Sequence, residues 1–78
     1  MSHNLVLYIK PTCPFCIKVL NFMDGRGIKL PMRDISTDAK AAATLVEVGG
    51  KRQVPCLFID GIPLYESDDI IAWLDLNA

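Results

Sequence analysis

The sequence predicts one small α/β domain over residues 1–78, in which helices flank a mixed four-stranded sheet. Short apolar runs rich in β-forming residues alternate with longer helix-forming segments, as is typical of α/β proteins. An Asp-Gly pair separates the last two apolar runs, and this dipeptide is a strong hairpin signal. The 78 residues are 51% hydrophobic, which is enough for a packed core and too much for a disordered segment.

The first predicted strand, helix and strand form a parallel β-α-β unit. Leu5–Ile9 is an apolar run too short for a helix, so we expect a buried strand there. A helix follows from Pro14, because proline suits a first helical position, and Gly25 and Gly27 are stop signals for it. Residues 30–35 are predicted to form a second, weaker strand.

A second helix and a hairpin are predicted next. Residues 39–48 are rich in helix formers, and residues 36–38 offer caps for the first turn. Residues 54–59 are expected to form the third strand. The Asp60-Gly61 turn then returns the chain into the fourth strand, residues 62–65.

The last predicted helix begins after the hairpin. Ser67 is expected to cap it, and Asp68 and Asp69 in its first turn suit the positive end of the helix dipole. Apolar residues between Ile70 and Leu76 give it a broad apolar face. The predicted order of elements is therefore β-α-β-α-β-β-α.

Composition and charge argue against several classes of function. The chain has 8 basic and 9 acidic residues, a formal net charge of −1 and no basic stripe, so no nucleic-acid partner is expected. Its apolar runs fall far short of the ~18 residues that a membrane span needs. Residues 1–4 lack the charged and apolar regions of a secretory signal. We therefore expect a cytoplasmic monomer without a membrane partner.

Two cysteines lie where the first strand gives way to the first helix. Cys13 falls at or beside the helix N-cap, where free backbone N–H groups and the helix dipole stabilise a thiolate. In such positions a thiol pKa can fall from about 8.5 to roughly 3.5–7.5, and Lys10 and Lys18 can add positive charge. Cys16 lies one turn further on, within reach of Cys13 but more buried. We therefore expect Cys13 to be the nucleophile and Cys16 to resolve the mixed disulfide.

Two simpler interpretations of the cysteine pair are weighed against redox chemistry. The pair can be half of a zinc site, which Cys56 and His3 would have to complete, but we expect His3 to lie in a frayed terminus. It can also be an inert structural disulfide, which a reducing compartment disfavours. A CxxC in a β-α-β context favours redox chemistry over both, with no metal expected.

Several spaced motifs together resemble the glutaredoxin family. They are YIKPTCPFC at residues 8–16, Val54-Pro55, LFIDG at residues 57–61 and ESDDI at residues 66–70. The resemblance covers nearly the whole chain, in the right order. It implies a thioredoxin fold and reduction of protein disulfides and glutathione mixed disulfides, with glutathione as the reducing co-substrate. It also implies a cis peptide bond before Pro55, beside the nucleophile.

The resemblance also implies a glutathione site assembled from both halves of the chain. The backbone of Val54 would pair with the cysteinyl part of glutathione. Ser67 and Asp68 match the γ-glutamyl site, where helix N–H groups suit an α-carboxylate and the Asp68 carboxylate suits an ammonium group. Lys10 and Arg52 are candidates for the glycine carboxylate, with Lys51 as the alternative to Arg52. Pro55 would border the site, and two aromatic side chains are expected to flank it: Tyr8 and Phe15.

Some residues depart from the family pattern. Gln53 stands where the family often has threonine, and Tyr65-Glu66 replaces a glycine pair before the last helix. The string PLYES at residues 63–67 instead resembles the amino-terminal domain of glutathione transferases, which use Glu-Ser for the same γ-glutamyl group. Cys56 is expected to pack within its strand, and a regulatory or oxidisable thiol is the alternative.

Two other functions remain as alternatives. A redoxin recharged by thioredoxin reductase would have the same fold, and the candidate ligands for the charged groups of glutathione argue against it. A non-enzymatic carrier of iron–sulfur clusters would use Cys13 and glutathione as ligands in a two-subunit assembly. Pro14 is expected to hinder that assembly.

Overall fold

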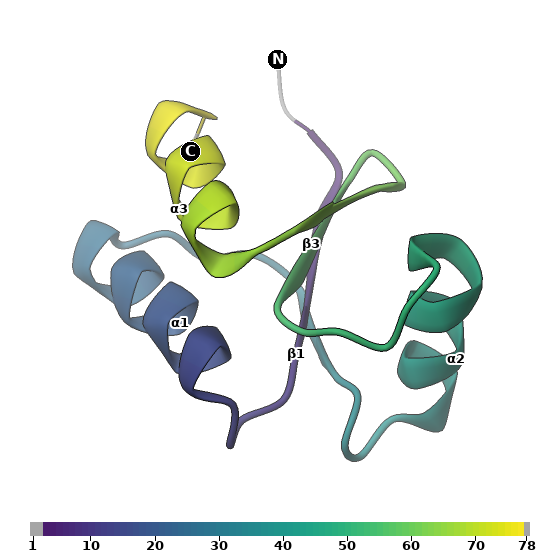
Figure 1. Ribbon diagram of the computed structural model, residues 1–78. Coiled ribbons are helices and arrows are strands. Elements are labelled where there is room, and N and C mark those ends of the chain that lie inside the picture. The colour runs from purple at the N-terminus through teal and green to yellow at the C-terminus, as the bar shows by residue number, and fades with distance from the viewer. Residues whose placement is uncertain (1–2, 78) are drawn as a thin grey trace.

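The computed structural model describes residues 3–77, and its elements follow the order β-α-β-α-β-β-α (Figure 1). Met1, Ser2 and Ala78, which the predicted domain of residues 1–78 includes, lie outside the described residues. Within residues 3–77 the strands are β1 (Leu5–Ile9), β2 (Met32–Asp34), β3 (Cys56–Ile59) and β4 (Ile62–Tyr65). The helices of the same segment are α1 (Pro14–Arg26), α2 (Ala39–Gly49) and α3 (Ser67–Asn77).

The strands form one mixed sheet in the order β2-β1-β3-β4. β1 and β2 are parallel, whereas β3 pairs antiparallel with both β1 and β4. Asp60 and Gly61 make the β3–β4 turn with φ values of 51° and 85°, the positive φ pair that a two-residue hairpin turn favours. The predicted α/β fold, with a four-stranded mixed sheet flanked by helices, is confirmed.

The helices cover both faces of the sheet. α1 and α3 lie side by side against one face and α2 covers the other (Figure 1). Side chains alternate between the faces of a strand, so neighbours such as Leu7 and Tyr8 enter different cores. The α1/α3 face buries Leu7, Ile9, Cys16, Val19, Met23, Leu57, Ile70 and Leu74. The α2 face buries Tyr8, Ile35, Ala41, Leu45, Cys56 and Phe58.

Local sequence explains how the first two helices begin. Cys13 has an extended backbone (φ −81°, ψ 123°) and is the N-cap of α1, with Pro14 in the first turn. Of the three residues expected to cap α2, Asp38 does so, and its Oδ1 accepts a hydrogen bond from the Ala41 N–H at 3.1 Å. None of the helices within residues 3–77 is long and apolar enough to cross a membrane.

Two predicted strands are shorter than expected. The second strand was expected over residues 30–35 but spans Met32–Asp34. Pro31 has no N–H to donate, and it contributes only a carbonyl, which accepts the Leu7 N–H at 2.9 Å. The third strand was expected from residue 54 but begins at Cys56, because Pro55 likewise lacks an N–H.

The expectation that Ser67 caps the last helix is wrong by one residue. Glu66 is the cap, since its carbonyl accepts the first helical hydrogen bond, from the Ile70 N–H at 3.0 Å. Glu66 has a φ of 72°, in the left-handed region that favours glycine. Ser67 is therefore the first residue of α3 and is buried.

Candidate active site

The Cys13 thiol lies half-buried at the start of α1, and its surroundings favour the thiolate. Burial opposes ionisation, but hydrogen bonds from the N–H and thiol of Cys16 and from the Phe15 N–H favour it, as does the charge of Lys10. The favourable contributions prevail, so the pKa of Cys13 is lowered from its ordinary value. The direction of this pKa shift is the one predicted from the helix N-terminus.

Cys16 lies one turn further along α1 and differs from Cys13 in every respect that matters for ionisation. Its side chain is fully buried, and burial raises its pKa to about 11, although the Lys10 N–H donates to its Sγ at 3.4 Å. Cys16 is therefore a neutral thiol near pH 7, able to donate a hydrogen bond to the Cys13 sulfur. The two thiols thus form an asymmetric pair, in which the pKa of Cys13 is lowered and that of Cys16 is raised.

A groove of about 200 Å³ lies between the α1 start, the residue 53–55 segment and the α3 start. Its lining is made of Phe15, Gln53, Val54, Pro55, Glu66 and Ser67. The peptide bond between Val54 and Pro55 is cis, as the family resemblance implies. Cys13 Sγ lies 3.9 Å from the Val54 carbonyl oxygen, so the Cys13 thiol is next to the groove-lining segment.

The groove combines an apolar side with a polar end. Phe15 projects with 62% of its surface exposed and, with Pro55, supplies apolar surface. At the other end Ser67 is buried beside Glu66, whose Oε1 accepts a hydrogen bond from Gln53 Nε2 at 3.2 Å. Of the predicted site residues, the lining therefore brings together Phe15, Val54, Pro55 and Ser67.

Three of the residues predicted to bind glutathione lie outside this lining. Asp68 is at the surface, where its carboxylate forms an ion pair with Lys18 of α1. Lys10 is exposed beside Cys13, and its positive charge lowers the Cys13 pKa. Arg52 is exposed next to the lining residue Gln53.

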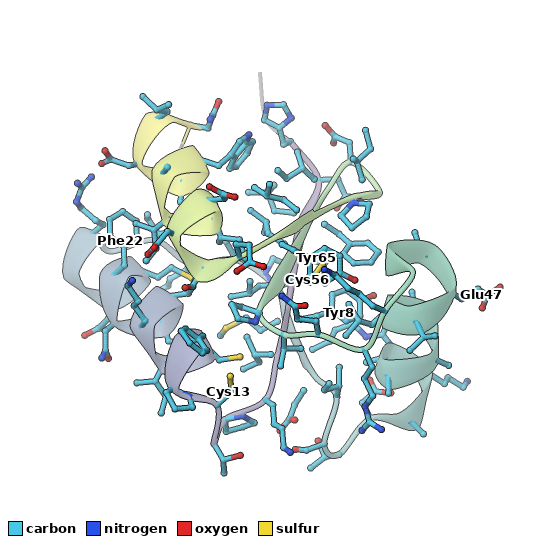
Figure 2. All side chains as sticks on the ribbon, in the orientation of Figure 1. Tyr8, Cys13, Phe22, Glu47, Cys56 and Tyr65 are labelled. Atoms are coloured by element: carbon cyan, nitrogen blue, oxygen red, sulfur yellow. The ribbon has the colours of Figure 1, made fainter. Side chains whose placement is uncertain are left out.

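The third cysteine lies on the other face of the sheet. Figure 2 shows Cys56 with Tyr8 and Tyr65 on the α2 side, away from Cys13. Cys56 is fully buried, so the expectation of a packed strand cysteine is confirmed. The expectation that Tyr8 flanks the site is wrong, because Tyr8 is buried in the α2-side core and stacks on Phe58 with ring centroids 4.6 Å apart.

The amino-terminal segment also differs from expectation. His3 was expected to be frayed, but its Nδ1 lies 2.8 Å from Asp60 Oδ2 and its ring makes a T-shaped contact with Trp73, with ring centroids 5.3 Å apart. Across residues 3–77, no three His, Cys, Asp or Glu side chains are grouped so as to hold a metal ion.

Sequence analysis missed three contacts that shape the site. They are the Gln53–Glu66 hydrogen bond, the Lys18–Asp68 ion pair and the hydrogen bond from the Tyr65 hydroxyl to the Lys51 carbonyl. The partners lie between 13 and 50 residues apart in the chain, so no local pattern signals them. The sequence does mark Gln53 and the Tyr65-Glu66 pair as departures from the family pattern, but it does not indicate that Gln53 and Glu66 contact each other.

Known proteins resemble this chain in both sequence and structure. The sequence profile of the glutaredoxin family matches residues 5–62. A probable glutaredoxin from a Synechocystis strain is 33% identical over 73 residues, which cover 92% of this chain and 83% of that protein. The crystal structure of a wheat glutaredoxin is 30% identical, with a TM-score of 0.71 over 95% of this chain and 73% of that chain.

A third similar protein is a buckwheat glutaredoxin whose crystal structure is a complex with glutathione. It is 25% identical, with a TM-score of 0.72 over 95% of this chain and 70% of that chain. The family profile spans well over half of the chain and includes the paired thiols, the cis proline and the Asp60-Gly61 turn. The chain therefore belongs to the glutaredoxin family and is a thiol–disulfide oxidoreductase with the thioredoxin fold.

Proposed function

We propose that the protein reduces protein disulfides and glutathione mixed disulfides with glutathione, using Cys13 as nucleophile and Cys16 as resolving thiol. The observation that carries this proposal is the position of Cys13. Its thiol has a lowered pKa and lies 3.9 Å from the carbonyl oxygen of Val54, which lines the groove. A thiolate beside a groove is what attack on a bound disulfide requires.

On a glutathione mixed disulfide, Cys13 acts without Cys16. Its thiolate attacks the glutathione sulfur, the substrate S–S bond breaks, and the substrate thiolate leaves and takes up a proton. A glutathione thiolate then attacks the glutathione sulfur held on Cys13. Glutathione disulfide forms, and Cys13 returns as a thiolate.

On a protein disulfide, both cysteines act. Cys13 attacks one substrate sulfur and forms a mixed disulfide, and the released substrate thiolate is protonated. Cys16 then loses its proton and attacks the Cys13 sulfur, which frees the second substrate thiol and leaves a Cys13–Cys16 disulfide. Two glutathione molecules reopen that bond in turn, so two electrons pass from glutathione to the substrate.

The groove supports a specific arrangement of glutathione. The cysteinyl part would pair with the backbone of Val54, and the α-carboxylate would meet the α3 N-terminus at Ser67. Asp68 would take the ammonium group in competition with Lys18, its present partner. Glu66 lines the same end of the groove and offers a second carboxylate. The buckwheat relative, which crystallised with glutathione, supports this class of ligand.

Two assigned ligands would act from outside the lining. Lys10 and Arg52 are exposed, and in this proposal they bind the glycine carboxylate through their long side chains. In sequence, Lys10 lies three residues before Cys13, and Arg52 lies directly before the lining residue Gln53.

The test is steady-state turnover of a glutathionylated peptide with glutathione and glutathione reductase. We expect saturable turnover that depends on glutathione. The same protein is then assayed with thioredoxin reductase as the only source of electrons. Turnover with that reductase, and none with glutathione, would favour the redoxin alternative instead.

A further inference from the structure

We propose that Tyr65 is a positioning residue for glutathione, because it fixes the residue 50–55 segment that carries one wall of the groove. No side-chain atom of Tyr65 lines the groove itself. The inference rests on the proposed function, since the quantity that Tyr65 sets is the affinity for glutathione.

The residue 50–55 segment belongs to no helix or strand. α2 ends at Gly49 and β3 begins at Cys56, so the segment lacks the hydrogen-bond ladder that holds regular elements. It nevertheless contributes three of the groove-lining residues: Gln53, Val54 and Pro55. Its position therefore depends on contacts from neighbouring side chains.

Tyr65 contacts one residue of this segment in two ways. Its hydroxyl donates a hydrogen bond to the Lys51 carbonyl oxygen at 3.0 Å. The Lys51 ammonium group in turn lies 4.5 Å from the centroid of the Tyr65 ring, in a cation–π contact. Both the backbone and the side chain of Lys51 are thus held by the last residue of β4.

The next residue of the chain holds the same segment at a second point. Glu66 accepts a hydrogen bond from Gln53, two residues after Lys51. One further residue on, the Val54 carbonyl oxygen lies 3.9 Å from Cys13 Sγ. The β4–α3 junction therefore fixes the segment next to the point where it meets the nucleophile.

Gly49 shows how closely α2 approaches the Tyr65 hydroxyl. A Cβ atom at Gly49 would lie 2.2 Å from Tyr65 Oη and 3.3 Å from Cζ. The first distance is shorter than any non-bonded contact allows, so a Gly49→Ala substitution must displace the hydroxyl. The Tyr65–Lys51 hydrogen bond can thus be broken from either side, by Tyr65→Phe or by Gly49→Ala.

The central experiment compares Tyr65→Phe with Tyr8→Phe. Both tyrosines pack in the α2-side core. The Tyr65 hydroxyl donates to the Lys51 carbonyl oxygen and also contacts the Cys56 thiol. The Tyr8 hydroxyl accepts a hydrogen bond from Arg33 Nη1 at 3.2 Å. A neutral hydrogen bond contributes about 1 kcal/mol, equivalent to about fivefold in an equilibrium constant. We expect Tyr65→Phe to raise the KM for glutathione about fivefold with kcat unchanged, and Tyr8→Phe to leave the KM at the wild-type value.

The Gly49→Ala variant tests the same hydrogen bond independently, from the α2 side. We expect it to raise the KM for glutathione as Tyr65→Phe does, and to add little when combined with Tyr65→Phe, since the displaced hydroxyl is then absent. An additive double variant overturns the proposal, as does a wild-type KM in Tyr65→Phe or an equal rise in Tyr8→Phe.

A measurement without glutathione separates this inference from the proposed function. Hydrogen exchange at the amides of residues 51–54 is followed in the free protein, and we expect faster exchange in Tyr65→Phe but not in Tyr8→Phe. Unchanged exchange overturns the positioning role even if glutathione turnover is normal. Absent glutathione turnover in the wild type overturns the proposed function even if exchange at these amides responds.

Discussion

Cys16 and Cys56 are two buried thiols on opposite faces of one sheet. Both are fully buried, and burial raises the pKa of each to about 11. Cys16 lies on the α1/α3 face, within hydrogen-bonding reach of Cys13. Cys56 lies on the α2 face with Tyr65 as its side-chain partner. Burial and pKa therefore do not distinguish the proposed resolving thiol from the packing thiol; the neighbouring side chain does.

The two faces of the sheet also differ in how far their side chains are exposed to solvent. The α1/α3 face leaves Cys13 half-buried and Phe15 exposed at its edge, where the groove opens. The α2 face instead buries a stacked aromatic pair, Tyr8 and Phe58. Substitutions at Cys13 and Phe15 should therefore change chemistry with little effect on stability, whereas substitutions in the stacked Tyr8–Phe58 pair should do the reverse.

The largest expected effect is that of Cys13→Ser. A serine hydroxyl at this position has no accessible anion near pH 7, so attack on a disulfide is lost. We expect turnover of glutathionylated peptide and of protein disulfide to fall to the uncatalysed rate, with the fold preserved by circular dichroism. Wild-type turnover in this variant would show that the nucleophile is misassigned.

The second effect compares the two buried thiols directly. Cys16→Ser should lose reduction of protein disulfides, which requires a resolving thiol, and keep part of its activity on glutathione mixed disulfides. Cys56→Ser should keep both activities, because this thiol lies on the other face of the sheet. Both substrates are assayed for each variant. Loss of protein-disulfide reduction in Cys56→Ser would contradict the assignment by location.

Much of the fold follows from local signals. The bounds of β1 and β4 are those predicted, since Lys10-Pro11 ends the first and Asp60-Gly61 begins the second. β2 was overestimated because an edge strand is defined by its pairing, and Pro31 supplies only a carbonyl to it. The asymmetry of Cys13 and Cys16 was also predictable from local sequence, because it depends on the position of each thiol relative to one helix N-terminus.

The surroundings of the groove were not predictable in this way. Lys18 and Asp68 lie 50 residues apart and meet only because α1 packs beside α3. Both had been expected to serve the site separately, Lys18 through its charge near Cys13 and Asp68 as a ligand. A sequence pattern gives the chemistry of each side chain, whereas pairing between distant elements depends on packing that the pattern does not specify.

A third prediction compares one aromatic side chain from each face. Phe58 is 7% exposed and stacks on Tyr8, so Phe58→Ala should lower the free energy of unfolding by about 3–5 kcal/mol. Phe15 is 62% exposed, so Phe15→Ala should change it by less than about 0.5 kcal/mol. Urea unfolding measures both. Phe15→Ala should instead raise the KM for glutathionylated peptide, and a stability loss equal to that of Phe58→Ala would contradict the contrast between the faces.

The smallest expected effect concerns the alkaline stability that Cys56 controls. Its pKa is raised by burial from 9.0 to about 11. Between these two pH values the thiol stays neutral in the folded protein but ionises in the unfolded chain. This contribution to stability is complete below pH 9 and is lost as the pH rises to about 11. Cys56→Ala should therefore reduce the fall in stability over this interval, by up to about 1.4 kcal/mol per pH unit.

Urea unfolding at several pH values under reducing conditions measures that slope. Removal of the buried sulfur in Cys56→Ala also changes the free energy of unfolding at every pH. The comparison therefore uses the slope of this free energy against pH and not its absolute value. Cys13 and Cys16 are present in both the wild type and Cys56→Ala. The contributions of their pKa shifts to the two slopes are therefore the same and drop out of the difference. Parallel slopes for the two proteins would mean that Cys56 ionises in the fold as readily as in the unfolded chain, which a fully buried thiol on the α2 face does not allow.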